Sequence, residues 1–388
     1  MKQLTEKVYY VGVNDHDIDL FEGQYVVPQG MSYNSYVIRD EKTCVMDAVD
    51  LRKADAWLKQ LDEVLCGQAP DYLVVQHMEP DHAGSIELFA HKYPDAVIVS
   101  NKKAFAMMQQ FFPALRLTNT LEVGEMSTLP LGTHTLTFIM APMVHWPEVM
   151  VTYDDADKIL FSADGFGKFG ALDAVEDWAC EARRYYFGIV GKYGKPVQAL
   201  LKKAAGLDIA AIYPLHGPML TENLSYYLNL YDTWSSYQPE SKGVMVFYAS
   251  VYGHTKEAAE KLCAKLVAAG VPQAEAVDLA RSDMAECVED AFRYDTMVLA
   301  SVTYNGDVFP CMNTFLHALT ERDYQNRRVG IIENGSWAPM AGKVIRKALE
   351  GSKNITFFEH TVSIKSALNG DSEAQLDALA QEIAAAYQ

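Results

Sequence analysis

The chain has 388 residues, of which 49% are hydrophobic and 22% are charged, and its net charge is -18. This length is more than one ordinary hydrophobic core can organise, so we expect two domains. The acidic residues are spread along the chain, which excludes nucleic acid and anionic membranes as expected partners because both bind a basic face. The strand-like pattern begins at once, so we expect no signal peptide, and no apolar run approaches the ~20 residues of a membrane-spanning helix.

The six cysteines are scattered, and none of them forms a CxxC pair. In a chain of this size, isolated cysteines are typical of reduced thiols in the cytoplasm, so we predict a cytoplasmic protein. The sequence gives no sign of an iron or zinc centre with cysteine ligands.

Strand and helix patterns are mixed in the first 240 residues. The early strands connect through turn-like breaks such as RDEK at 39–42, which indicates hairpins, so a strictly alternating parallel sheet is not expected. The predicted strands are 7–13, 34–40, 43–49, 71–76, 96–100, 134–141, 149–154, 158–164 and 208–215, and the predicted helices are 54–65, 82–93, about 175–203 and one beginning at 222.

The pattern changes after WSSYQPESKG at 234–243, a polar stretch without periodicity that we interpret as a linker. Strands and helices then alternate, which predicts a doubly wound parallel sheet. We therefore expect one domain over residues 1–240 and another over 241–388. The predicted strands of the second domain are 243–250, 275–280, 296–301, 327–334 and 355–360, and its predicted helices are 255–270, 284–293, 311–320, 341–350 and 374–387.

The stretch HMEPDH, at 77–82, places two histidines and two acidic residues between a predicted strand and a predicted helix. A loop that is held at both ends can point such side chains inward together. His77 and Glu79 lie two apart on extended backbone and can face one side, while Asp81 and His82 can serve a neighbouring position. This density of potential ligands predicts two metals in one pocket.

Further candidate ligands follow apolar strands, at the point where a sheet presents its working edge. They are His145, Asp164 and His216. The complete set of four imidazoles and three carboxylates, with no thiolate, allows zinc or iron, and the carboxylate share favours iron. A carboxylate such as Asp164 can supply one oxygen to each of two metals.

The motif resembles the HxHxDH signature of the metallo-β-lactamase fold, with Glu79 in place of the second histidine. That change, together with the flanks APMVHWPEVM, ILFSADGFGKFG and YPLHGP, resembles the flavodiiron proteins, or A-type flavoproteins, over essentially the whole chain. The resemblance implies an α/β protein with an N-terminal metallo-β-lactamase-like αββα sandwich and a C-terminal flavodoxin-like doubly wound sheet. It implies one iron held by His77, Glu79 and His145, another held by Asp81, His82 and His216, and Asp164 as the bridge.

Polar loops follow the first, third and fourth predicted strands of the second domain, and such loops leave the carboxyl ends of the strands, where ligands bind. The first loop begins a helix and can offer N–H groups and hydroxyls to a phosphate. Together the loops resemble those that hold FMN in flavodoxin, with Tyr304 and Trp337 as candidates to flank its ring. The candidate FMN contacts are Ser250, Val251, Tyr252, Gly253, His254, Thr255, Val302, Thr303, Tyr304, Asn305, Gly306, Asn334, Gly335, Ser336 and Trp337.

Some positions depart from the pattern of the family. His254 stands where an asparagine is usual, and ENGSW at 333–337 stands where the loop usually resembles GSYGW. Two histidines that often lie near the metals are replaced here by Glu22 and Phe169, and Glu22 is a candidate proton donor in place of the first.

The resemblance implies that FMN relays electrons to the irons, which reduce O₂ to water, NO to N₂O, or both. It also implies a head-to-tail homodimer or a dimer of dimers. The sequence has no rubredoxin-like CxxC pairs and no additional dinucleotide fingerprint, so we expect an external electron donor, rubredoxin or reduced F420. Two alternatives remain open: a zinc hydrolase of the metallo-β-lactamase type that cleaves an ester or amide, and a flavin electron carrier with an inactive metal domain.

Overall fold

The computed structural model describes residues 2–388, which form two compact units. The first unit runs up to Tyr186 and includes Lys195–Asp232, and the second consists of Phe187–Gly194 and Thr233–Gln388. The domain boundary at residue 240 stays a prediction. None of the helices in residues 2–388 combines the length and the apolar character that a membrane span requires.

The first unit contains most of the strands and seven of the α-helices. Its strands are β1 (Lys2–Gln3), β2 (Val8–Tyr10), β3 (Val13–Asp15), β4 (Leu20–Phe21), β5 (Tyr25–Val26), β6 (Met31–Tyr33), β7 (Tyr36–Arg39), β8 (Thr43–Met46), β9 (Tyr72–Val74), β10 (Val97–Ser100), β11 (Thr120–Glu122), β12 (Thr128–Pro130), β13 (Thr135–Met140), β14 (Met150–Asp154), β15 (Ile159–Phe161) and β16 (Ala211–Tyr213). Its α-helices are α1 (Ala54–Leu65), α2 (Pro80–Ala83), α3 (Ile86–Lys92), α4 (Lys102–Phe111), α5 (Trp178–Tyr185), α6 (Gly194–Ala204) and α7 (Leu224–Ser235).

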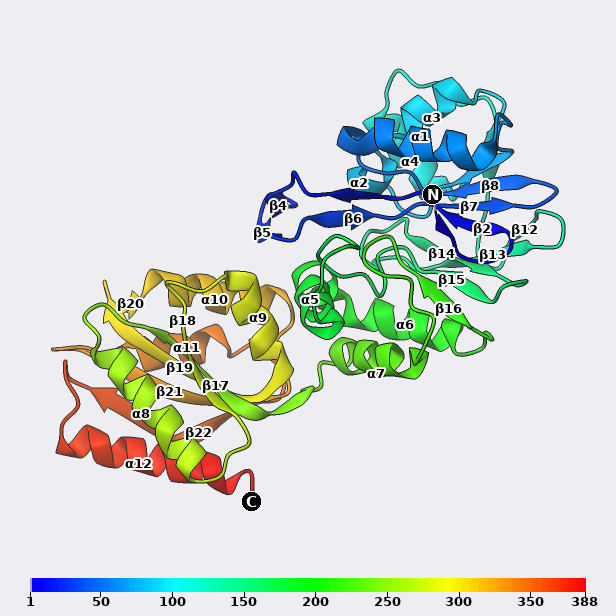
Figure 1. The fold of residues 1–388 in the computed structure, drawn as a ribbon. Helices are drawn as coiled ribbons and strands as arrows, with labels where there is room; N and C mark the ends of the chain where they lie inside the picture. Colours follow the sequence, from blue (N-terminus) through cyan, green and yellow to red (C-terminus); the bar gives the residue numbers. More distant parts are fainter. Residues whose placement is uncertain (1) are drawn as a thin grey trace. The chain divides into compact units, whose positions relative to one another are not determined.

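Two sheets pack face to face in this unit, one with the order β1-β2-β7-β8-β9-β10-β11 and the other with the order β12-β13-β14-β15-β16. Buried residues of both sheets, such as Ile38, Val74, Phe138 and Phe161, form the core between them. Helices α1, α3 and α4 lie on the outer side of the first sheet, and α6 and α7 lie on the outer side of the second (Figure 1). The predicted αββα sandwich is therefore confirmed.

The strands that lead into the candidate ligands are short, apolar and almost fully buried. β9 pairs in parallel with β8 and β10, and β15 pairs in parallel with β16. Continuous apolar runs are typical of parallel strands that are covered on both faces. Each run ends where polar side chains begin, so the sequence itself positions the site at the carboxyl ends of these strands.

Two predicted helices of this unit are interrupted. The helix expected over 82–93 is split into α2 and α3 at Gly84 and Ser85, where the Ser85 amide donates to the carbonyl oxygen of Val49 instead. The helix expected over about 175–203 becomes α5, a π-helical turn, a short 3₁₀ turn and α6. Gly188 and Gly191 lie in the interrupted part, and Gly194 and Pro196 lie in the first turn of α6; these residues weaken a continuous helix.

The second unit has its own sheet and helices. Its strands are β17 (Ser241–Ala249), β18 (Ala274–Asp278), β19 (Tyr294–Tyr304), β20 (Asp307–Val308), β21 (Arg327–Asn334) and β22 (Ile355–Ile364), and its helices are α8 (His254–Ala268), α9 (Met284–Arg293), α10 (Pro310–Glu321), α11 (Ala341–Ala348) and α12 (Gly370–Ala385). Because α7 extends to Ser235 and β17 begins at Ser241, the connection between them is shorter than the linker predicted over 234–243.

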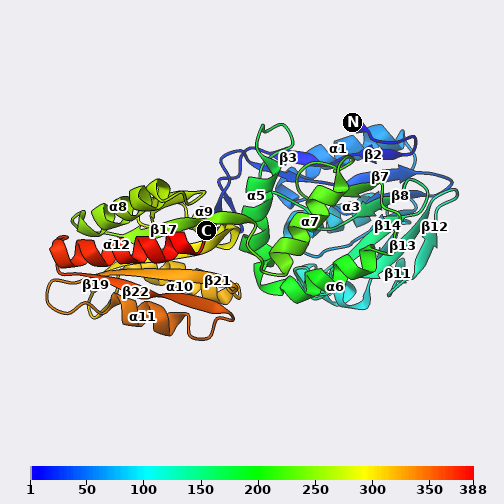
Figure 2. The ribbon, with the colours of Figure 1, turned by 90° about the horizontal axis from the view of Figure 1, so that it is seen from below.

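The main sheet of this unit has the order β18-β17-β19-β21-β22, and every pairing along it is parallel. In chain order this is the 2-1-3-4-5 arrangement of flavodoxin-like folds. Helices α8 and α12 cover one face, and α10 and α11 cover the other (Figure 2). Leu262 of α8 and Leu376 and Leu379 of α12 pack on Val246 and Val298 in one buried core. The predicted doubly wound sheet is confirmed.

Candidate functional site

The structure brings together all seven side chains that the sequence predicts as metal ligands. They come from separate segments: the loop and short helix that follow β9, the β13–β14 connection, and the loops that follow β15 and β16. All of them are buried, and none is more than 9% exposed. The seven are His77, Glu79, Asp81, His82, His145, Asp164 and His216.

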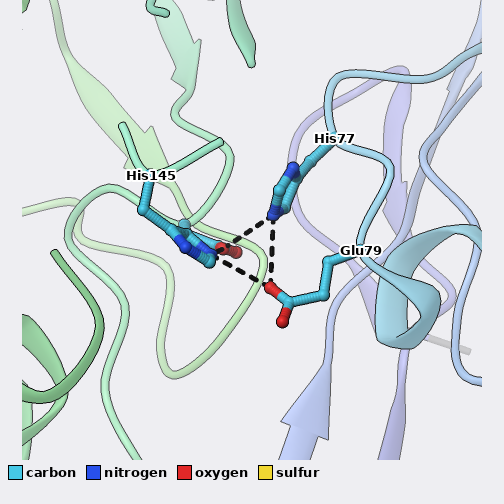
Figure 3. Close-up of side chains that lie close together, drawn as sticks. His77, Glu79 and His145 are labelled. Carbon is cyan, nitrogen blue, oxygen red and sulfur yellow. Dashed lines mark hydrogen bonds and ion pairs between the residues drawn. The ribbon is translucent and has the colours of Figure 1, made fainter. Parts of the chain in front are cut away.

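The first group consists of His77, Glu79, His145 and Asp164. Figure 3 shows the two imidazoles turned toward the Glu79 carboxylate. Glu79 Oε2 lies 3.0 Å from His145 Nε2 and 3.3 Å from His77 Nε2. Asp164 Oδ2 lies 3.1 Å from His145 Nε2 and 3.3 Å from His77 Nε2. Four potential ligand atoms thus surround one point.

The second group consists of Asp81, His82 and His216. The Nε2 atoms of His82 and His216 are 3.0 Å apart, and Asp81 Oδ2 lies 3.2 Å from each of them. Asp164 Oδ1 lies 3.2 Å from His82 Nε2. The Asp164 carboxylate therefore directs one oxygen to each group.

Hydrogen bonding alone does not satisfy these atoms, whereas a pair of cations does. His145 Nε2 faces two carboxylates but can donate only one proton. Among residues 2–388, both oxygens of Asp81 and Oδ1 of Asp164 are buried without a hydrogen-bond donor. Ligand atoms around an octahedral metal at ~2.1 Å lie roughly 3.0 Å apart, which is the spacing seen here. The residues therefore fit two metal ions.

The electrostatics of the pocket also favour positive charge. Burial lowers the pKa of His145, but hydrogen bonds to Asp164 and Glu79 outweigh burial and raise it to about 9. Burial raises the pKa of Asp164, yet the surrounding imidazoles of His77, His145 and His82 hold it well below its usual range. A site that keeps carboxylates ionised in the interior attracts cations.

Two ligand imidazoles are held by groups that the sequence reasoning missed. His77 Nδ1 lies 2.8 Å from Glu148 Oε1, which also accepts from the Met78 amide at 2.9 Å. His216 Nδ1 donates to the carbonyl oxygen of Ser32 at 2.7 Å. Such contacts fix the tautomer and turn Nε2 toward the pocket. The acid in HWPE was visible in the sequence, but nothing there indicated which histidine it contacts.

A cavity of about 320 Å³ adjoins the metal-binding residues, and Glu79 and Asp81 are part of its lining. Glu22, on the turn between β4 and β5, also lines it. Burial and the neighbouring Glu79 carboxylate raise the pKa of Glu22 to about 7. The second departure, Phe169, is fully buried and packs edge-on against Phe21 and Tyr185, with ring centroids 5.8 Å and 5.2 Å away. That position supplies apolar surface.

The candidate FMN residues lie at the carboxyl ends of β17, β19 and β21, which are neighbours in the sheet. Strand β19 extends past its predicted end at 301 and includes Val302, Thr303 and Tyr304, and β21 ends at Asn334. The loops therefore meet at one edge. Tyr252 and Trp337 are each 90% exposed and Tyr304 is 48% exposed, so three aromatic faces are open to a ligand. Val251, Gly253, His254, Asn305, Gly306 and Ser336 are also exposed, Ser250, Val302 and Thr303 are half-buried, and Thr255, Asn334 and Gly335 are buried.

Several residues of these loops hold the loops in place. The Asn334 side chain donates to the carbonyl oxygen of Ser366 at 2.9 Å and accepts from its amide at 3.1 Å. Glu333, one of the departures from the family pattern, accepts from the Gly342 amide at 2.9 Å and the Ser363 hydroxyl at 3.1 Å. Glu333 therefore anchors the start of α11. Ser366 was not predicted, because a lone serine after a strand carries no distinctive signal.

Comparison with known proteins gives consistent matches over both units. The family model described as ODP family beta lactamase matches residues 31–217, and a flavodoxin domain model matches residues 245–360. A nitric oxide reductase from Moorella thermoacetica is 27% identical over 98% of each chain. The crystal structure of the flavodiiron protein from Giardia intestinalis is 26% identical with a TM-score of 0.92, covering 100% of this chain and 97% of that one. The rubredoxin oxygen:oxidoreductase from Desulfovibrio gigas is 25% identical with a TM-score of 0.89, covering 99% of this chain and 98% of that one.

Proposed function

Because this chain belongs to the flavodiiron proteins, we propose that it is an oxidoreductase that reduces O₂ to water, NO to N₂O, or both. The observation that carries the proposal is the pair of buried ligand groups that share Asp164. One similar protein is named a nitric oxide reductase, and another is named an oxygen oxidoreductase. The cofactors are two irons and FMN.

We assign the first iron to His77, Glu79 and His145, and the second to Asp81, His82 and His216, with Asp164 shared. The distances of 3.0–3.3 Å around Glu79 and Asp164 support this division. Two carboxylates at the first position suit iron better than an all-imidazole set does.

The two irons and FMN, when bound, would supply the redox chemistry that reduces the diatomic substrate. The residues of the chain control access and protons. The cavity beside Glu79 and Asp81 admits a small molecule. Phe21 packs against the His216 ring, with centroids 5.4 Å apart, and thus shields that ligand from water. We propose Glu22 as the proton donor because it lines this cavity beside Glu79.

For FMN, we propose that the loops at 250–255, 302–306 and 334–337 hold the cofactor. The start of α8, where Gly253 has φ +95° and open space around its α-carbon, offers backbone N–H groups to the phosphate. The exposed rings of Tyr304 and Trp337 suit stacking against the flavin ring.

We further propose an external electron donor, either rubredoxin or reduced F420, and a head-to-tail dimer or a dimer of dimers. The name of the Desulfovibrio gigas protein, which includes rubredoxin, supports the first donor. We place the protein in the cytoplasm because each of its six cysteines is a free thiol.

Turnover of the protein loaded with iron and FMN tests the proposal. The reduced protein is mixed anaerobically with NO, and separately with O₂, and consumption of each gas is followed. We expect consumption well above that of free FMN for at least one gas. Consumption equal to that of free flavin would favour the electron-carrier alternative, and two zinc ions per chain with ester or amide cleavage would favour the hydrolase.

A further inference from the structure

The ligand histidines of the two groups differ in the hydrogen-bond partners of their Nδ1 atoms. At the first position, His77 Nδ1 contacts a carboxylate, Glu148 Oε1, at 2.8 Å. At the second position, His216 Nδ1 donates to a neutral backbone carbonyl, and His82 Nδ1 has no hydrogen-bond partner among residues 2–388. A carboxylate makes an imidazole more basic than a carbonyl oxygen does, and so strengthens it as a metal ligand.

The Glu148 side chain is fully buried, and one of its two oxygens, Oε2, lacks a hydrogen-bond partner within the described residues. Its backbone is fixed by Asn101, which donates to the Glu148 carbonyl oxygen at 2.6 Å and also caps α4. A buried carboxylate with a free oxygen is costly unless a positive charge lies nearby. His77 contacts Glu148 through Nδ1 and offers Nε2 to the first metal position, so it connects the two.

We infer that Glu148 makes the two metal positions unequal, so that the position of His77, Glu79 and His145 binds its metal more tightly and fills first. The inference rests on the proposed two-metal site and adds a positioning residue to it. Asp164 contributes to both positions and therefore does not distinguish them. Glu79 and Asp81 each contribute one carboxylate, and the buried Asp47 carboxylate interacts electrostatically with both His82 and His77. The hydrogen bond between the Glu148 carboxylate and His77 is therefore what separates the two positions.

The variant Glu148→Gln tests this effect with little change of shape. The amide oxygen can still accept from the Met78 amide and from His77 Nδ1–H, but the charge is lost. In an anaerobic Fe²⁺ titration of the metal-free protein against a coloured chelator, we expect two binding steps in the unchanged protein. In the variant, the tighter step should weaken by about 10- to 100-fold, the usual effect of losing such a partner, and the gap between the steps should narrow.

Single-position backgrounds identify which metal is affected. His216→Ala removes a ligand from the second position, and in this background Glu148→Gln should weaken the remaining metal by about 10- to 100-fold. His145→Ala removes a ligand from the first position, and there Glu148→Gln should change the affinity by less than about threefold. Equal effects in both backgrounds would overturn the inference. If neither background binds Fe²⁺, an unchanged gap between the two steps in Glu148→Gln alone would overturn it.

Glu63→Gln serves as the matched control, because Glu63 is exposed on α1, belongs to neither ligand group, and loses the same charge. It should leave both steps unchanged. Retained FMN binding shows that the second unit is folded, and an unchanged thermal transition of the metal-free first unit shows that the first unit is folded. The outcomes also separate the two claims: an unchanged protein that binds no Fe²⁺ contradicts the proposed function, whereas two equal binding steps contradict only the role of Glu148.

Discussion

The metal-binding residues and the flavin loops differ in how far the chain completes each site by itself. Every candidate metal ligand is at most 9% exposed, and two of them, His77 and His216, are fixed by further hydrogen bonds. The loops at the edge of the second sheet instead leave Tyr252 and Trp337 90% exposed. The first site is thus assembled during folding, and the second remains an open surface that its ligand completes.

This difference follows from the chemistry of the two ligands. A metal ion is held by a few short contacts to charged and polar atoms, which must be desolvated and oriented before binding. FMN has a large aromatic ring and a phosphate, which exposed rings and backbone N–H groups can bind. The comparison therefore predicts that disturbing the metal ligands changes the first unit strongly, whereas disturbing the flavin loops has milder and more local effects.

Asp164→Ala should give the largest effect. It removes the one carboxylate that serves both groups, so both metals should be lost or weakened. We expect gas consumption to fall by at least about 1000-fold, to the level of free flavin, as for loss of residues that act as a unit. Iron content and gas consumption are measured together, and FMN content should stay unchanged.

Asp95→Ala, a substitution of an exposed acid in the same unit, is the control and should behave like the unchanged protein. Full activity in Asp164→Ala would show that the ligand assignment is wrong. Loss of FMN together with iron would contradict the independence of the two sites.

Removal of the metals should lower the stability of the first unit. A metal present at 1,000 times its dissociation constant stabilises the folded state by about 4 kcal/mol. For a unit of this size, each kcal/mol corresponds to a shift of about 2–4 °C in melting temperature. Calorimetry before and after chelation should therefore show a fall of roughly 8–16 °C in one transition, while removal of FMN should leave that transition in place.

How much of this could be read from the sequence depends on the kind of contact. The candidate ligands follow apolar strands, and a strand end is a local signal; His145, Asp164 and His216 were therefore accessible before the fold was known. Their assignment as ligands stays a prediction. Glu148 was not accessible, because its partner His77 lies 71 residues away and only the folded chain brings them together.

The helices and strands also divide into those that the local sequence pattern predicted and those that it did not. The alternation of strands and helices predicted the second sheet, and α9 and β21 match their expected ranges. Helix α4 was missed because its run of five consecutive apolar residues, 104–108, shows no helical period, although Asn101 gives it a good N-cap. The prediction of one long helix over about 175–203 was wrong, because it gave the apolar spacing more weight than the glycines within the segment.

Glu22→Gln examines an exposed carboxylate that lines the cavity beside the metal-binding residues. Glutamine keeps the shape of the side chain but cannot deliver a proton. If Glu22 is the proton donor, gas consumption should fall by about 100-fold, at the low end of the range for a general acid, and iron content should not change. Gln24→Ala, which removes only the hydrogen-bond donor of Glu22, should have a smaller effect. Unchanged turnover in Glu22→Gln would assign proton delivery to water.

Trp337→Ala should give the smallest effect, and it measures how open the flavin edge is. An aromatic pair contributes about 0.5–1.5 kcal/mol beyond the area it buries, so FMN affinity should fall by roughly 2- to 13-fold. Because the ring is 90% exposed, its removal leaves no cavity, and the melting temperature of the FMN-free second unit should be unchanged. Val175→Ala, at another fully exposed apolar side chain, is the control for loss of surface area. A fall in iron content in Trp337→Ala would mean that the flavin edge and the metal ligands are not built independently.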